Sequence, residues 1–168
     1  MTSKRQEGFS LIELLIVVAI IGIIAAIAIP NLLSSKRAAN EGSAQSSLRT
    51  IHSSEAVYQA TAGNGSYGPM SIAGTAGELS LVGQNLVDSV LGTGSKSGYT
   101  FVITADNTVN PVNFYAEAHP SNVAAVTRTG NRSFTIAEDG VLRGKVSDTG
   151  PATHAAAITS ATWPPLGN

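Results

Sequence analysis

The sequence predicts an α+β fold in which a long N-terminal helix packs against a small antiparallel sheet. Two observations lead to this prediction. An apolar run ends at Pro30 and is followed by a proline-free, helix-like segment to Thr61, and several short alternating strand patterns follow Tyr99. One kind of element followed by the other is typical of α+β domains, whereas α/β domains alternate them.

The bulk composition allows one modest domain plus an anchor in 168 residues. The net charge is -1 and only 12% of residues are charged, so the basic stripe of a nucleic-acid-binding protein is missing and no direct nucleic-acid site is predicted. The absence of cysteine excludes a disulfide framework and Cys-type metal sites.

The anchor candidate is the run from Phe9 to Ile29, where only Ser10, Glu13 and Gly22 are not plainly apolar. As a helix, 21 residues span about 30 Å, which is the thickness of a bilayer core. Residues 9–30 are therefore predicted to form a transmembrane helix. A buried helix of a soluble protein is the first alternative, although such helices are usually shorter.

A cleaved secretory signal is the second alternative, because Ala26-Ile27-Ala28 offers an A-x-A-like cut site. The apolar run before that site is longer than a signal-peptide core and contains Glu13. Basic residues flank the run on both sides, at positions 4–5 and 36–37. The positive-inside rule alone therefore hardly discriminates between the two orientations of the helix in the membrane. The short leader and the large polar segment behind it favour a single pass with a cytoplasmic N-terminus.

The boundary sequence Gly8-Phe9-Ser10-Leu11-Ile12-Glu13 resembles the processing signature of type IV prepilins and type II secretion pseudopilins, the prepilins with a class III signal and an N-terminal methylation motif. In that family a short basic leader is cut after Gly, and the new N-terminal residue, usually Phe, is N-methylated. The resemblance covers about the first 60 residues, including Pro30. It implies a leader over residues 1–8, a processing site at Gly8 and Phe9, N-methylation of Phe9, and a type IV pilin fold.

Glu13 has a chemical reason to be present in this setting. A carboxylate inside a membrane costs about 2.5–3.5 kcal/mol by insertion scales unless it is paired. A cut after Gly8 creates an amine at Phe9, and positions i and i+4 share a helix face. The amine that pairs with Glu13 could come from the same chain or from a neighbouring subunit. The resemblance implies the neighbouring subunit. In that case the pairing of Phe9 with Glu13 guides assembly. The alternative is an incidental charge near the headgroups.

Pro30 ends the apolar run and removes one backbone donor from the helix. Together with Gly22 it bounds the weakest helical stretch of the anchor. The resemblance implies that this kinked or flexible stretch loosens when the helix leaves the membrane for a fibre. The alternative is that Pro30 simply marks the membrane exit.

Residues 31–61 are predicted to continue the helix spine, with an apolar stripe at helical spacing that Arg37 and Glu55 interrupt. The stripe consists of Leu33, Ala44, Leu48, Ile51, Tyr58 and Ala62. Residues 62–97 are predicted to form a connecting loop region, in which residues 78–91 could make a short helix.

The segment 98–146 is predicted to form an antiparallel meander of three or four strands. The strand patterns lie at residues 99–105, 113–119, 132–137 and 141–145. Asp139-Gly140 between the last two is a hairpin signal. Residues 147–168 are predicted to form a tail on the surface that Trp163 holds down.

No enzyme site is predicted. His52, His119 and His154 lack metal-ligand spacing. Some major pseudopilins bind calcium near their C-terminus, and Glu138, Asp139 or Asp148 could serve as ligands here. No spaced oxygen-ligand loop supports that reading. Neither a cofactor nor a metal is therefore expected.

The resemblance implies a structural subunit, a pilin, that is processed in the inner membrane and polymerised into an extracellular type IV pilus fibre. The implied partners are identical subunits, a prepilin peptidase and methyltransferase, the inner-membrane assembly machinery and the lipid bilayer. Adhesion, motility and DNA uptake cannot be ranked from the sequence.

Two other functions stay open. A pseudopilin of a type II secretion system is the first, because Tyr58 followed by Asn64-Gly65-Ser66-Tyr67 partly fits a pseudopilin turn. The chain's length, the missing calcium loop and the Thr, Ala and Gly-rich composition favour a pilin. The second is a membrane-tethered binding domain that never polymerises.

Overall fold

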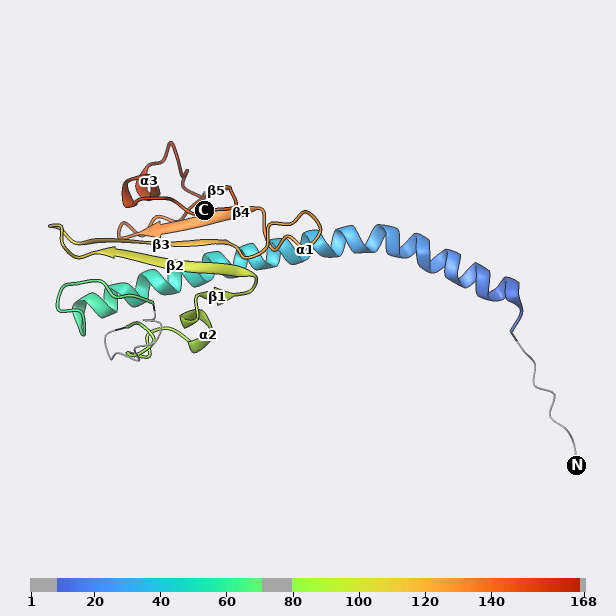
Figure 1. Cartoon of the computed structure of the whole chain (residues 1–168), viewed down its shortest axis with the longest axis horizontal. Helices are drawn as coiled ribbons and strands as arrows, with labels where there is room; N and C mark the ends of the chain where they lie inside the picture. The colour runs from blue at the N-terminus through green and yellow to red at the C-terminus, as the bar shows by residue number, and fades with distance from the viewer. Residues whose placement is uncertain (1–8, 71–79, 167–168) are drawn as a thin grey trace, which may run out of the picture. The chain divides into compact units, whose positions relative to one another are not determined.

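The structure is a computed structural model that describes residues 9–70 and 80–166. The chain divides into two compact units, residues 1–36 and 37–168. Figure 1 draws its elements in chain order: α1 (Leu11–Ala60), α2 (Ser89–Gly92), β1 (Ser95–Lys96), β2 (Tyr99–Asp106), β3 (Asn113–Pro120), β4 (Arg132–Ala137), β5 (Arg143–Val146) and α3 (His154–Ile158).

The predicted antiparallel meander is confirmed in the second unit. Five strands pair in chain order, β1-β2-β3-β4-β5, and every pairing is antiparallel. The register places Phe101 opposite Ala118, and Phe134 opposite Ala118 on one side and Gly144 on the other. The turn at Asp139-Gly140 joins β4 to β5, and Gly140 has a φ of 69°, a conformation that glycine adopts at little cost.

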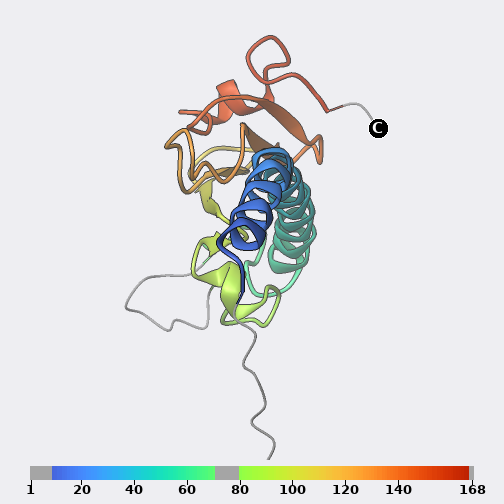
Figure 2. The ribbon, with the colours of Figure 1, turned by 90° about the vertical axis from the view of Figure 1, so that its right-hand side faces the viewer.

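The core of the second unit lies between the sheet and the part of α1 that follows Arg37 (Figures 1 and 2). The helix contributes four residues of the predicted stripe, Ala44, Leu48, Ile51 and Tyr58, all of them buried. The sheet contributes buried aromatic and aliphatic side chains, which are Tyr99, Phe101, Phe114, Ala116, Ala118, Phe134 and Ile136. The fold is therefore the predicted one, a long helix packed against an antiparallel sheet.

The connecting region differs from the prediction. Residues 78 and 79 of the expected 78–91 helix lie outside the described residues, and turns occupy 81–85. Only α2, four residues long, is helical, and Asp88 begins it by accepting the backbone N–H of Leu91 at 2.9 Å. The segment before Asp88 has Gly83 and a left-handed Asn85, and both disfavour a helix interior.

The tail after residue 147 contains the short helix α3, which the sequence pattern did not predict. Thr153 caps it by accepting the backbone N–H of Ala156. Trp163 is buried, and the Lys145 ammonium lies 5.4 Å from its ring centroid, within cation–π range. The tail thus packs on the sheet through Trp163, as predicted.

Candidate functional site

The candidate site is the N-terminal part of α1, where the processing and assembly residues were predicted. Gly8 and the leader 1–8 lie outside the described residues, so the cut after Gly8 stays a prediction. The description begins at Phe9, whose side chain is 90% exposed. Phe9 and Ser10 precede the first helical residue, Leu11, so the proposed new terminus lies at the start of the helix.

Glu13 closes the first turn of that helix through a local hydrogen bond. Its Oε2 accepts the backbone N–H of Ser10 at 2.9 Å, while the Ser10 carbonyl accepts the backbone N–H groups of Glu13 and Leu14. Ser10-Leu11-Ile12-Glu13 matches the S-x-x-E capping-box spacing, in which the glutamate satisfies a free donor at the helix N-terminus. The sequence prediction missed this second function of Glu13, although the spacing was readable.

This geometry places a negative charge where a helix N-terminus favours one. Phe9 is the residue immediately before Ser10, so an amine created at Phe9 would form next to a backbone N–H that already binds the carboxylate. A carboxylate has two oxygens and about four lone-pair sites, so the bond to Ser10 does not use up its acceptor capacity. The structure brings Glu13 to Ser10 and leaves the pairing with Phe9 as a prediction.

Apart from Glu13 and Gly22, the residues from Leu11 to Ile29 are apolar, and their large side chains are exposed. Every large apolar side chain from Leu11 to Ile29 is at least half exposed. Glu13 is the only Asp, Glu, Lys or Arg between residues 9 and 35. By length and composition, α1 is long and apolar enough to cross a membrane. A surface of this kind requires lipid or other protein to cover it.

Pro30 lies inside α1, and the helix continues past it. Proline has no N–H, so the carbonyl of Ala26 loses its usual helical partner. One position on, the Asn31 side-chain amide donates to the Ile27 carbonyl at 3.0 Å, which adds a bond to the turn next to the proline. A Cβ built on Gly22 would meet no atom within 4 Å, so in the single chain packing does not require glycine there. The proposed looseness of this stretch stays a prediction.

The three carboxylates considered for calcium each pair with a basic side chain. Asp139 binds the Arg143 guanidinium at 2.6 Å, and Glu138 binds the His154 ring at 2.8 Å. Asp148 pairs with Arg128. Within residues 9–70 and 80–166, no group of three or more His, Asp or Glu side chains could hold a metal ion.

A family model described as the prokaryotic N-terminal methylation motif matches residues 3–29. The type IV major pilin protein of Myxococcus xanthus is 47% identical over 53 residues, which are 32% of this chain and 24% of that protein. The type IV wide pilus major component of Thermus thermophilus is 45% identical over 56 residues, 33% of this chain and 43% of its own length. The type II secretion system core protein G of Aeromonas hydrophila is 34% identical over 59 residues, 35% and 41% of the two chains.

Each of these matches spans less than half of the curated relative's length. No solved structure is a significant match to the chain. The matched segments, 53 to 59 residues, are about as long as α1.

Proposed function

Through its N-terminal region the chain belongs to the family of type IV pilins and type II secretion pseudopilins, and on that premise we propose that it is a pilin. In this proposal the prepilin peptidase cuts after Gly8, Phe9 is N-methylated, and the subunit is polymerised from the inner membrane into an extracellular fibre of identical subunits. The chain is a structural protein and not an enzyme, which agrees with its family.

One observation supports the assembly step most directly: a single carboxylate, Glu13, lies at the start of an otherwise uncharged and exposed apolar helix. In lipid such a charge is stable only when it is paired. The amine of a neighbouring Phe9 would pair with it only at one axial position. That pairing would set the register of each incoming subunit.

The exposed apolar surface of residues 11–29 supports the same proposal in a second way. Lipid covers it before assembly, and the corresponding helices of neighbouring subunits would cover it in the fibre. A repeated contact between two different surfaces of identical subunits produces an open helical filament when the rotation does not close. The inner-membrane assembly machinery is the partner that would move the helix from one environment to the other.

The test compares two substitutions of Glu13, produced with the prepilin peptidase and assembly machinery. Glu13→Ala removes both the charge and the cap, whereas Glu13→Gln removes the charge and keeps a side chain that completes a capping box. We expect both variants to insert in the membrane and both to lose most fibres, because the amine of a neighbouring subunit pairs with the negative charge that both variants lack. Fibre yields are counted by electron microscopy of sheared material, and membrane insertion is checked by resistance to carbonate extraction.

Normal fibre yield from Glu13→Gln, with loss only from Glu13→Ala, would assign Glu13 to the helix cap and refute the register function. Loss of membrane insertion in either variant would show that the carboxylate serves the anchor itself.

A pseudopilin of a type II secretion system is the second candidate. Core protein G of Aeromonas hydrophila is among the relatives that match, and the turn after α1 partly fits the pseudopilin pattern. In that turn Asn64 and Gly65 both have positive φ angles, 47° and 93°. Deletion of the gene separates the two functions. A pilin deletion removes surface fibres, whereas a pseudopilin deletion leaves fibres intact and stops the secretion of other proteins.

A further inference from the structure

The loop between β3 and β4, residues 121–131, carries an exposed apolar tip. The tip is Val123-Ala124-Ala125-Val126, and all four residues are exposed. Val126 is 73% exposed and Val123 is 46% exposed, values close to those of the membrane-seeking side chains of unit 1. Surface loops usually place polar residues at their tips, so four consecutive apolar residues here call for a partner.

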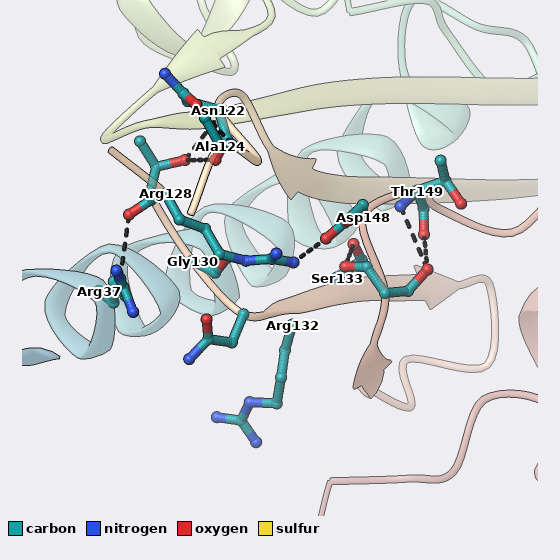
Figure 3. A network of polar contacts seen from close by, with 12 residues as sticks. Arg37, Asn122, Ala124, Arg128, Gly130, Arg132, Ser133, Asp148 and Thr149 are labelled. Carbon is teal, nitrogen blue, oxygen red and sulfur yellow. Dashed lines mark hydrogen bonds and ion pairs between the residues drawn. The ribbon is translucent and has the colours of Figure 1, made fainter. Parts of the chain in front are cut away.

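The base of this loop is fixed to α1 by polar contacts (Figure 3). The Arg37 guanidinium donates to the carbonyls of Ala125 at 3.2 Å and Arg128 at 3.3 Å. One turn further along α1, the Asn40 amide donates to the Thr129 carbonyl at 2.8 Å. Both anchors bind backbone carbonyls, so they hold the course of the loop whatever its side chains are.

A second set of contacts fixes the end of the loop. The Glu41 carboxylate accepts the backbone N–H of Asn131 and the Arg132 guanidinium, each at 2.9 Å. Arg128 donates to the Gly130 carbonyl at 2.8 Å and pairs with Asp148. These contacts hold the loop against α1, in part through the carbonyl of the tip residue Ala125, and leave the Val123 and Val126 side chains exposed.

The chain length keeps this loop close to any membrane that residues 9–30 span. Arg37 is the seventh residue after Pro30. Seven residues cover about 10 Å as a helix and at most about 25 Å fully extended, so this limit holds for any arrangement of the two units. The loop binds the guanidinium of Arg37, so it lies no farther from the membrane exit than that distance plus the length of one arginine side chain.

Arg37, Arg128 and Arg132 lie at the loop base. Arg128 pairs with Asp148 and Arg132 pairs with Glu41, whereas the Arg37 guanidinium binds backbone carbonyls, so its charge is not offset by either of these carboxylates. Basic residues near a membrane are attracted to anionic lipid headgroups, and apolar side chains beside them enter the boundary between headgroups and acyl chains.

We propose that the Val123–Val126 tip inserts into the headgroup region of the bilayer while the subunit is still in the membrane. The proposal rests on the proposed function, because it requires residues 9–30 to span a bilayer. The tip provides a second membrane contact beside the helix. That contact is released when the subunit moves into the fibre.

The test uses the natural absence of cysteine, which makes any introduced cysteine the only labelling site. The full chain carries Val126→Cys with a polarity-sensitive fluorophore and is reconstituted in vesicles of phosphatidylethanolamine and phosphatidylglycerol. Val109→Cys is the control, because it lies in the β2–β3 connection, at the opposite end of β3 from the loop. The eight residues of β3 separate the two sites by about 26 Å. Val18→Cys reports on the spanning segment.

We expect headgroup-labelled nitroxide lipids to quench the probe at residue 126 at least about threefold more than the probe at residue 109. A Val123→Ser, Val126→Cys variant should lose most of this difference while its thermal unfolding is unchanged. Equal quenching at residues 126 and 109, or protection of residue 126 only in assembled fibres, would overturn the proposal and assign the tip to solvent or to a subunit contact.

The probe at residue 18 separates this inference from the proposed function. If residue 18 is quenched by lipid and residue 126 is not, the tip proposal fails and the membrane anchor stands. If residue 18 is accessible to an aqueous quencher in the vesicles, the spanning premise fails and both proposals fail with it.

Discussion

Glu55 is a carboxyl group that the fold buries completely. Its side chain is 0% exposed, and Oε2 accepts the backbone N–H of Gly68 at 2.9 Å. Oε1 has no hydrogen-bond partner within the described part of the chain. Burial raises the pKa of Glu55 to about 7, and the bond from Gly68 acts in the opposite direction. The residue is therefore mostly neutral in the folded state at mildly acidic pH.

This burial predicts a pH-dependent stability. The folded pKa is above the ordinary value of 4.5, so the folded state holds the proton more tightly than the unfolded state. The contribution of Glu55 to the free energy of unfolding is most favourable below pH 4.5 and is lost as the pH rises to about 7. The loss is on the order of 3 kcal/mol. Glu55→Gln cannot ionise, so its stability should exceed that of the wild type at pH 8 and lose this advantage at pH 5.

Thermal unfolding of both proteins in the same detergent at pH 5 and pH 8 measures this effect. Other titrating groups are common to the two proteins and cancel in the difference. An identical pH dependence of the two melting temperatures would mean that Glu55 ionises freely in the folded state.

At the scale of elements, α1 has different partners along its length. Its buried residues all follow residue 40 and pack in the second unit, whereas residues 11–29 are exposed. A substitution in the later part of the helix should therefore be measured as a loss of stability. A substitution in the earlier part should act on insertion or assembly.

Leu48→Ala and Val57→Ala test this division on one helix. Leu48 is 0% exposed and Val57 is 47% exposed. Truncating a buried leucine costs about 2–5 kcal/mol, because it removes apolar contacts and leaves a cavity. Truncating an exposed valine should change stability by less than about 0.5 kcal/mol. Chemical denaturation of the detergent-solubilised chain gives both values, and equal effects would contradict the packing described here.

The sequence predicted the long helix and four strands because each has a strong periodic pattern. Ala44, Leu48, Ile51 and Tyr58 share a helical stripe, and β2 to β5 carry alternating or turn-bounded patterns. It missed β1 and α3 and expected a longer helix, over residues 78–91, where only α2 forms; these elements are two to five residues long and too short to show a period. These short elements depend on single caps and on pairing with a neighbouring strand.

Part of the candidate functional site was predictable because single residues stand out from the sequence around them. Glu13 is conspicuous because a charge is rare in an apolar run, and its cap to Ser10 follows a known spacing. In the sequence pattern, Arg37 and Glu55 only interrupt the apolar stripe. Their partners, Ala125 and Arg128 for the first and Gly68 for the second, lie in other segments. No local pattern in the sequence identifies such partners, because the tertiary fold alone brings them together.

At the scale of the whole molecule, the proposed function requires one helix to serve two environments in succession. In the proposed function, residues 9–30 would be covered by lipid before assembly and by neighbouring subunits afterwards. The second unit needs no such change, because its core is closed by its own sheet and by the later part of α1. In this account, cleavage of the leader separates the two stages, because it creates the amine that Glu13 binds in the fibre.

The most direct test of this account is the mass of the mature N-terminus, measured by mass spectrometry of the protein isolated from its native host. If the protein is a processed pilin, the chain begins at Phe9 and carries one methyl group on its amine, with residues 1–8 removed. An intact chain beginning at Met1, or a chain beginning near Ile29 after signal-peptide cleavage, would contradict it.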